Sequence, residues 1–127
     1  MVYFLTPDAS LVQLDLSIPS LPETVIITKV EDFVVDTVNT TTLTLLTCGG
    51  QVMRDNKSTT LTGDGVTVEH WTTIVKVSDR LVVSGWRQSK QQNILFLLDS
   101  DLQVLTSLNI SCISVSTLST DPRLSHP

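Results

Sequence analysis

The side chains that could do catalytic chemistry are few and widely spaced in this chain. Its two histidines are His70 and His126, and neither has a second nitrogen or sulfur ligand at a spacing that suits zinc. Ser84 precedes Gly85 and Trp86, but the G-x-S-x-G elbow of serine hydrolases is absent. A triad would have to combine Ser84 with His70, and no orienting acid is visible. We therefore predict no catalytic residue, no metal site and no enzyme activity.

Aspartates and glycines in the predicted turns could in principle hold a cation or a phosphate. Asp99 and Asp101 flank a turn as calcium ligands do, yet the glycine and the distal glutamate of an EF-hand loop are missing. Neither Gly49-Gly50 nor Gly63-Asp64-Gly65 carries the Lys-Ser/Thr ending of a phosphate loop. We interpret the aspartates as turn caps and the glycines as hairpin turns, and we predict no cofactor.

Surface recognition is the remaining class of function. Trp71 and Trp86 are the largest apolar side chains, and both fall at predicted strand ends. At such places an aromatic ring either fills a gap in the core or anchors a partner. Arg87 opens the polar loop Arg87–Gln92, which together with Asp55–Ser58 would offer a binding face. We name Trp71, Trp86 and Arg87 as candidate binding residues, with packing as the alternative for the two tryptophans.

Charge and hydropathy narrow the choice of partner. The net charge is −5 and the pI is about 4.7, whereas contacts to nucleic-acid phosphates or to anionic lipids need clustered Lys and Arg. The basic residues are scattered, and only Arg80, Arg87 and Lys90 lie near one another. No apolar run approaches the roughly 18 residues that span a bilayer. We therefore predict a protein partner, with no nucleic acid and no membrane.

The cysteines and the first residues bear on the compartment. Val2–Thr6 reads as a strand and not as a signal sequence, which favours an intracellular location. Cys48 and Cys112 could form one bridge, but a reduced intracellular domain also carries two cysteines. Three Asn-x-Ser/Thr triplets, at Asn39, Asn56 and Asn109, would fit the alternative of an extracellular protein.

The composition predicts an all-β protein. The chain has a single alanine, Ala9, and three Glu, against 16 Val, 18 Thr and 14 Ser. Helices prefer the residues that are scarce here, while pleated sheets accept those that are abundant.

The stretch Thr73–Leu108 has the pattern of one four-stranded β-propeller blade. Its predicted strands are Ile74–Val77, Leu81–Gly85, Asn93–Leu98 and Leu102–Leu108. Asn93–Leu98 contains an unbroken apolar run, so we expect that strand to be covered on both faces. Earlier strands are predicted at Val2–Thr6, Leu11–Leu16, Val25–Val30, Phe33–Val38, Asn39–Leu46, Gln51–Arg54, Thr59–Thr62 and Val66–Trp71, and a later one at Ile110–Val115.

Two internal echoes suggest a repeat. Thr28–Thr37 resembles Val75–Ser84, with Lys29 and Lys76 separated by 47 positions, near the usual blade length. A second echo, an apolar run that enters a turn, begins at Phe4, Leu45 and Phe96. Together they predict about two and a half propeller blades over residues 1–118, with 119–127 as a disordered tail or the edge of a truncation. The alternative is that the same strands close into a two-layer β-sandwich.

A family resemblance makes this prediction more specific. Asn93–Leu98, followed by Leu102–Leu108 and the serine-rich Ser111–Asp121, resembles part of the N-terminal propeller of the rough deal family of kinetochore proteins. Val2–Asp36 can be laid on the preceding blade with gaps, although the Gly-His and Trp-Asp signatures of WD40-like repeats are absent. The resemblance implies a noncatalytic scaffold in a spindle-checkpoint complex, with Zwilch as the neighbour of the propeller. It fixes no binding residue, because no motif matches.

Overall fold

The computed structural model describes residues 1–37, 40–61, 68–87 and 91–111. These residues form eleven β-strands and contain no helix, so the all-β prediction is confirmed. Every strand pair whose register is defined is antiparallel. The described part of the chain therefore has no long helix that could cross a membrane.

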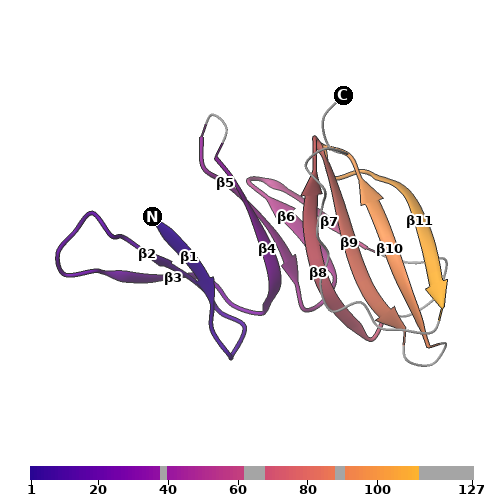
Figure 1. Cartoon of the computed structure of the whole chain (residues 1–127), viewed down its shortest axis with the longest axis horizontal. Coiled ribbons are helices and arrows are strands. Elements are labelled where there is room, and N and C mark those ends of the chain that lie inside the picture. Colours follow the sequence, from indigo (N-terminus) through magenta and orange to yellow (C-terminus); the bar gives the residue numbers. More distant parts are fainter. Residues whose placement is uncertain (38–39, 62–67, 88–90, 112–127) are drawn as a thin grey trace. The chain divides into compact units, whose positions relative to one another are not determined.

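Each of the three sheets is a meander of consecutive strands (Figure 1). The first contains β1 (Val2–Leu5), β2 (Leu11–Leu14) and β3 (Glu23–Ile27). The second contains β4 (Val30–Asp36), β5 (Thr42–Thr47), β6 (Gln51–Arg54) and β7 (Lys57–Thr60). The third contains β8 (His70–Val77), β9 (Arg80–Arg87), β10 (Gln92–Leu98) and β11 (Val104–Ser111). The chain forms two compact units, Met1–Val30 and Glu31–Pro127, and the second holds the last two sheets almost entirely.

The third sheet has the four strands predicted for it, with corrected ends. Of the expected strand Val66–Trp71, His70 and Trp71 lie in β8 together with the strand expected from Ile74, because a bulge between Trp71 and Thr73 carries the chain through without a turn. Val68 and Glu69 precede the strand. Leu102 lies in a turn with φ of 65° and not in β11. β11 continues past Leu108 to Ser111, so no new strand begins at Ile110. Residues 62–67 and 112–127, including the predicted tail, lie outside the described residues.

The apolar side chains of β10 are fully buried on one face and only half-buried on the other, where Asn93 alone is fully buried, so the prediction of cover on both faces is corrected. Ile94, Phe96 and Leu98 are at most 2% exposed, while Leu95 and Leu97, which point to the other face, are half-buried. An unbroken apolar run therefore marks a strand with one core face and one apolar outer face in this sheet.

The 47-residue echo does not align equivalent strands. Lys29 lies in the link between β3 and β4, which belong to different sheets, whereas Lys76 lies in β8, which pairs directly with β9. By order within their sheets, β4 corresponds to β8. The two stretches look alike because both join an apolar strand to the next through a short polar turn.

The second echo corresponds to one turn geometry that occurs three times. In the turns after β1, β5 and β10 the fourth residue has positive φ, and its N–H donates to the carbonyl of the first residue at 3.0 Å. The side-chain oxygen of the first residue accepts from the N–H of the fifth at 2.9 to 3.1 Å. The first residues are Thr6, Thr47 and Asp99, and the positive-φ residues are Ala9, Gly50 and Leu102.

In all three turns the carbonyl of the positive-φ residue accepts a further hydrogen bond from outside the hairpin. Ala9 accepts from the N–H of Val30 at 2.8 Å, and Gly50 accepts from the N–H of Leu61 at 2.9 Å. Leu102 accepts from the hydroxyl of Thr59 at 2.8 Å. Each turn therefore reverses the chain and also attaches it to a neighbouring segment.

One apolar core joins the second and third sheets. It combines side chains of β5 and β6 with side chains of β8, β9 and β10, and the rings of Trp71 and Phe96 lie 5.7 Å apart at its centre. Burial of each large side chain stabilises the fold by about 1.5–3 kcal/mol. The buried members are Leu46, Val52, Leu61, Trp71, Ile74, Leu81, Val83, Ile94, Phe96, Leu98 and Leu102.

A carboxylate joins the first strands of these two sheets. Oδ2 of Asp32 on β4 accepts from the Thr73 hydroxyl at 2.8 Å and from the Ile74 N–H at 2.9 Å, both on β8. Oδ1 accepts from the N–H of Phe33 at 2.9 Å. Since β8 is an edge strand, its outward N–H groups lack a strand partner, and Asp32 supplies the acceptor that Ile74 needs.

The first prediction concerns this carboxylate. Asp32→Ala should lower the free energy of unfolding by about 1–3 kcal/mol, because the buried Ile74 N–H loses its acceptor. Asp36→Ala is the matched control on the same strand, because the Asp36–Lys76 ion pair is about one-third exposed and should contribute about 1 kcal/mol or less. Urea denaturation measures both changes. Equal losses would contradict the role given to Asp32.

The second prediction compares two adjacent glycines. Gly50 has φ of 85°, and a Cβ there would lie 2.4 Å from Nε1 of Trp71. Gly50→Ala should therefore cost about 2–4 kcal/mol, from backbone strain and overpacking. At Gly49 the nearest atom to a Cβ is Thr47 Oγ1 at 3.9 Å, so Gly49→Ala should change stability by about 0.5 kcal/mol or less. Thermal unfolding of the two variants tests the difference, and a tolerated Gly50→Ala would refute it.

Candidate functional site

The three predicted binding residues lie in different environments. Trp71 is 6% exposed and belongs to the core, held between Gly50 and Gly85, so packing is its observed role. Arg87 is also 6% exposed; it ends β9, and its Nη1 donates to Oδ1 of Asn109 at 3.2 Å. Trp86 is half-buried and points to the opposite face of the third sheet from Trp71. Only Trp86 therefore offers a partner a substantial part of its side chain.

The expected binding loops are also shorter than predicted. Arg87 belongs to β9 and Gln92 to β10, and residues 88–90 between them lie outside the described residues. In Asp55–Ser58 only Asp55 and Asn56 form a turn, because Lys57 and Ser58 begin β7. Asp55 of this second turn belongs to the lining of the cleft described below.

The residues considered for catalysis do not form a site in the described ranges. The Ser84 hydroxyl is buried and lies 2.5 Å from the Thr72 hydroxyl, and His70 is exposed. Oδ1 of Asp99 accepts from the N–H groups of Asp101 and Gln103, both at 2.9 Å, as a turn cap does. No group of three or more His, Cys, Asp or Glu side chains suited to a metal ion occurs among residues 1–37, 40–61, 68–87 and 91–111.

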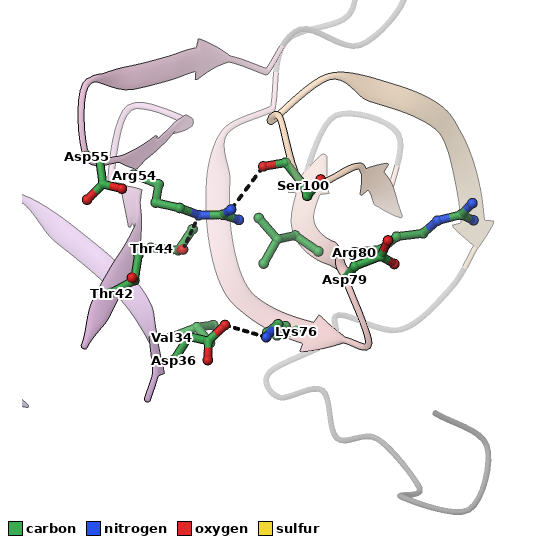
Figure 2. Close-up of a pocket in the computed structure, with 11 residues that line it drawn as sticks. Val34, Asp36, Thr42, Thr44, Arg54, Asp55, Lys76, Asp79, Arg80 and Ser100 are labelled. Atoms are coloured by element: carbon green, nitrogen blue, oxygen red, sulfur yellow. Dashed lines mark hydrogen bonds and ion pairs between the residues drawn. The ribbon is translucent and has the colours of Figure 1, made fainter. Parts of the chain in front are cut away.

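A polar cleft lies between the second and third sheets, at the end where the turns after β6, β8 and β10 meet (Figure 2). Its volume is about 330 Å³. Apolar side chains of Val34 and Leu81 belong to its lining, where the core reaches this end. The polar lining residues are Asp36, Thr42, Thr44, Arg54, Asp55, Lys76, Asp79, Arg80 and Ser100.

Arg54 is held firmly inside this cleft. Its Nε donates to Oγ1 of Thr44 at 3.0 Å, and its Nη1 donates to the carbonyl of Ser100 at 2.9 Å (Figure 2). Thr44 lies on β5 and Ser100 in the turn after β10, so both sheets fix the guanidinium. Beside it, Nζ of Lys76 pairs with Oδ2 of Asp36 at 2.5 Å.

The rim of the cleft has three charged residues without an ion pair. Asp55, Asp79 and Arg80 are exposed and take part in none of the ion pairs of the described residues. The side chain of Arg80 points away from Arg54 (Figure 2). Together with Arg54, Lys76 and Asp36, the described lining residues include three cations and three aspartates, so their formal charge is zero.

The lining, in the part of the chain that the structure describes, has no histidine or cysteine. It does offer fixed hydrogen-bond donors above an apolar floor, which is what recognition of a polar ligand requires. No pattern in the sequence predicts this site. Arg54, Lys76 and Asp36 are single charged residues on three strands, and no local pattern shows that these strands meet.

Comparison with protein-family models, with curated proteins and with solved structures gave no match. The functional assignment therefore rests on the residues and the geometry of this chain.

A third prediction concerns the ion pair beside the cleft. Lys57 donates to Asp101 at 2.8 Å, and this hydrogen bond and the Lys57 charge lower the pKa of the Asp101 carboxyl. A lowered pKa means that the pair stabilises the fold above about pH 4 and loses this effect as the pH falls through the folded-state pKa. Lys57→Gln should return the pKa of Asp101 toward its ordinary value.

A carbon-detected NMR titration of the carboxyl groups measures this change. Asp15 is the control, because Ser17 and not Lys57 lowers its pKa. The pKa of Asp15 should stay the same in Lys57→Gln. An unchanged titration of Asp101 would show that Lys57 does not perturb it in solution.

Proposed function

We propose that the chain is a noncatalytic protein–protein interaction module, a segment of a β-propeller that scaffolds an intracellular complex. The observation that carries this proposal is an apolar outer face on the third sheet. By strand register the apolar residues of this face are Val75, Val82, Leu95, Leu97, Leu108 and Ile110, and we call these six residues the open face. The first four are half-buried, while Leu108 is 59% and Ile110 39% exposed. The polar residues Ser84, Asn93 and Thr106 lie on the same side of the sheet, and Ser84 and Asn93 are buried there.

The open face has the apolar character of a sheet surface that packs against another sheet. Across its centre the residues paired in register are Val75, Val82 and Leu97, and the next row contains Leu95 and Leu108. A continuous apolar patch on a sheet marks a place where a further layer or a partner packs. Trp86 points to the same side, so it keeps its predicted role as a partner anchor within this proposal.

The order of the strands supports a propeller over a sandwich. Blades of a propeller are meanders of four consecutive strands, whereas Greek-key sandwiches alternate strands between two sheets. Here each four-stranded sheet uses consecutive strands, and the first strands β4 and β8 are joined through Asp32. In this proposal the open face packs against the next blade, and the rough deal resemblance implies a kinetochore complex with Zwilch as the neighbouring protein.

The second candidate is a self-contained β-sandwich that binds its partner in an extracellular setting. Asn56 and Asn109, two of the three Asn-x-Ser/Thr acceptors, are exposed, as glycan attachment requires. Asn39 lies outside the described residues. A sandwich would seal its apolar faces and behave as a monomer, so oligomeric state separates the two candidates.

A fourth prediction tests the open face directly. If this face needs a partner, the chain alone should self-associate, because exposed apolar sheet surface is buried between copies. Leu108→Glu should weaken that association by about tenfold or more, since it places a charge where a large apolar side chain would be buried. Light scattering coupled to size-exclusion chromatography measures the mass at several concentrations.

Leu105→Glu is the matched control for this experiment. Leu105 is on the same strand and 46% exposed, but it lies at the bulge of β11, where it has no register partner in β10, and it is not one of the six residues of the open face. It should leave the association unchanged. A monomeric chain with a sharp two-state melt would overturn the propeller proposal and support the sandwich.

A further inference from the structure

We infer that the cleft between the second and third sheets binds the carboxylate of an acidic side chain, presented by an extended segment of a partner protein. The receiving group is the Arg54 guanidinium, assisted by Lys76. This inference rests on the proposed function, because it takes the ligand to be part of a partner protein. It concerns a different surface from the open face.

The hydrogen bonds of Arg54 leave most of its donors available. A guanidinium carries five N–H donors, and two of them are used by Thr44 and Ser100. Three donors remain on a group whose position is already fixed from both sheets. A fixed, planar donor set of this kind binds a carboxylate at a lower entropic cost than a mobile side chain does.

The charges inside the cleft select a singly charged anion. Arg54 and Lys76 outweigh Asp36, so the inner part has a formal charge of +1. The whole lining is neutral, because Asp55 and Asp79 lie on the rim with Arg80. A phosphate dianion would meet three aspartates, whereas one carboxylate matches the excess charge of the inner part.

The floor and size of the cleft fit a side chain with an apolar stem. Leu81 is 1% exposed and Val34 packs on the core, so both present aliphatic surface next to the two cations. A volume of about 330 Å³ accommodates one or two side chains and not a folded domain. Low polarity beside the donors also strengthens their hydrogen bonds.

The unpaired rim aspartates favour basic neighbours in the ligand. Asp55 and Asp79 lie on turns of different sheets, so a segment that crosses the cleft would pass both. Lysine or arginine beside the bound acid would complement them. The partner segment is therefore a glutamate or aspartate flanked by basic residues.

The test uses three acetylated and amidated peptides with the full chain: Lys-Ser-Glu-Ser-Lys, the same peptide with glutamine at the centre, and one with phosphoserine there. The ¹⁵N NMR spectrum, including the Arg54 Nε–H signal, reports binding. The glutamate peptide should give saturable shifts at Arg54 and Leu81, and the glutamine peptide should bind about tenfold more weakly or not at all, since its hydrogen bonds lack the charge.

Variants then assign the contact. Arg54→Gln should abolish the preference for glutamate over glutamine, while Lys57→Gln, whose side chain is exposed and paired with Asp101, should keep it. If Arg54→Gln does not fold, the comparison of the three peptides on the unaltered chain still shows whether the cleft prefers a carboxylate. Equal binding of the glutamate and glutamine peptides, tighter binding of the phosphoserine peptide, or no binding at all would overturn the inference.

The two proposals fail in different ways. If the chain binds the glutamate and glutamine peptides equally but still self-associates through Leu108, the carboxylate site is refuted and the interaction module is retained. If the chain is a monomer and still prefers the glutamate peptide to the glutamine peptide, the propeller proposal is refuted and the chain is a carboxylate-binding domain.

Discussion

The bond between Asp32 and β8 is the constraint on which the arrangement of the second and third sheets depends. Apolar packing alone brings two sheets together without fixing how far one slides along the other, since hydrophobic attraction is not directional. The carboxylate adds direction, because it accepts from both the Thr73 hydroxyl and the Ile74 N–H at 2.8 and 2.9 Å. The two donors belong to consecutive residues, which follow directly after the bulge in β8.

The cleft lies between the same two sheets that this attachment joins. Asp32 joins β4 to β8, and the buried core beneath it continues to Leu81 near the turn that follows β8. Beyond that point the facing side chains are polar, so the sheets enclose Arg54, Lys76 and Asp36 in place of a packed interior. One pair of sheets therefore provides a rigid core at its centre and a polar recess at its end.

The sequence predicts local features of this fold well. Strand period and turn residues are encoded within a few neighbours, and the order of the strands from Ile74 to Leu108 follows from them. The predicted strand bounds differ from the observed ones where a bulge occurs, as at Trp71, or where a large residue adopts positive φ, as at Leu102. An apolar residue in a turn looks like the start of a strand when only side-chain type is considered.

The candidate site could not be predicted in the same way. Asp32 and Thr73 are 41 residues apart, and Arg54 and Ser100 are 46 apart, so their contacts arise from sheet packing and not from spacing along the chain. For Trp71 the residue type was informative, but it left two roles open. Its size is compatible with a partner anchor or with packing in the core, and two glycines leave the space that takes its ring into the core.

The recurrent five-residue turn has a consequence for how the chain can vary. Its outward attachment uses the carbonyl of Ala9, Gly50 or Leu102, a group that every amino acid possesses. The attachment itself therefore does not depend on the residue type, and alanine, glycine and leucine all occur there, although the positive φ costs the two residues that have a Cβ some backbone strain. Connections made by the main chain can persist while the side chains around them diverge.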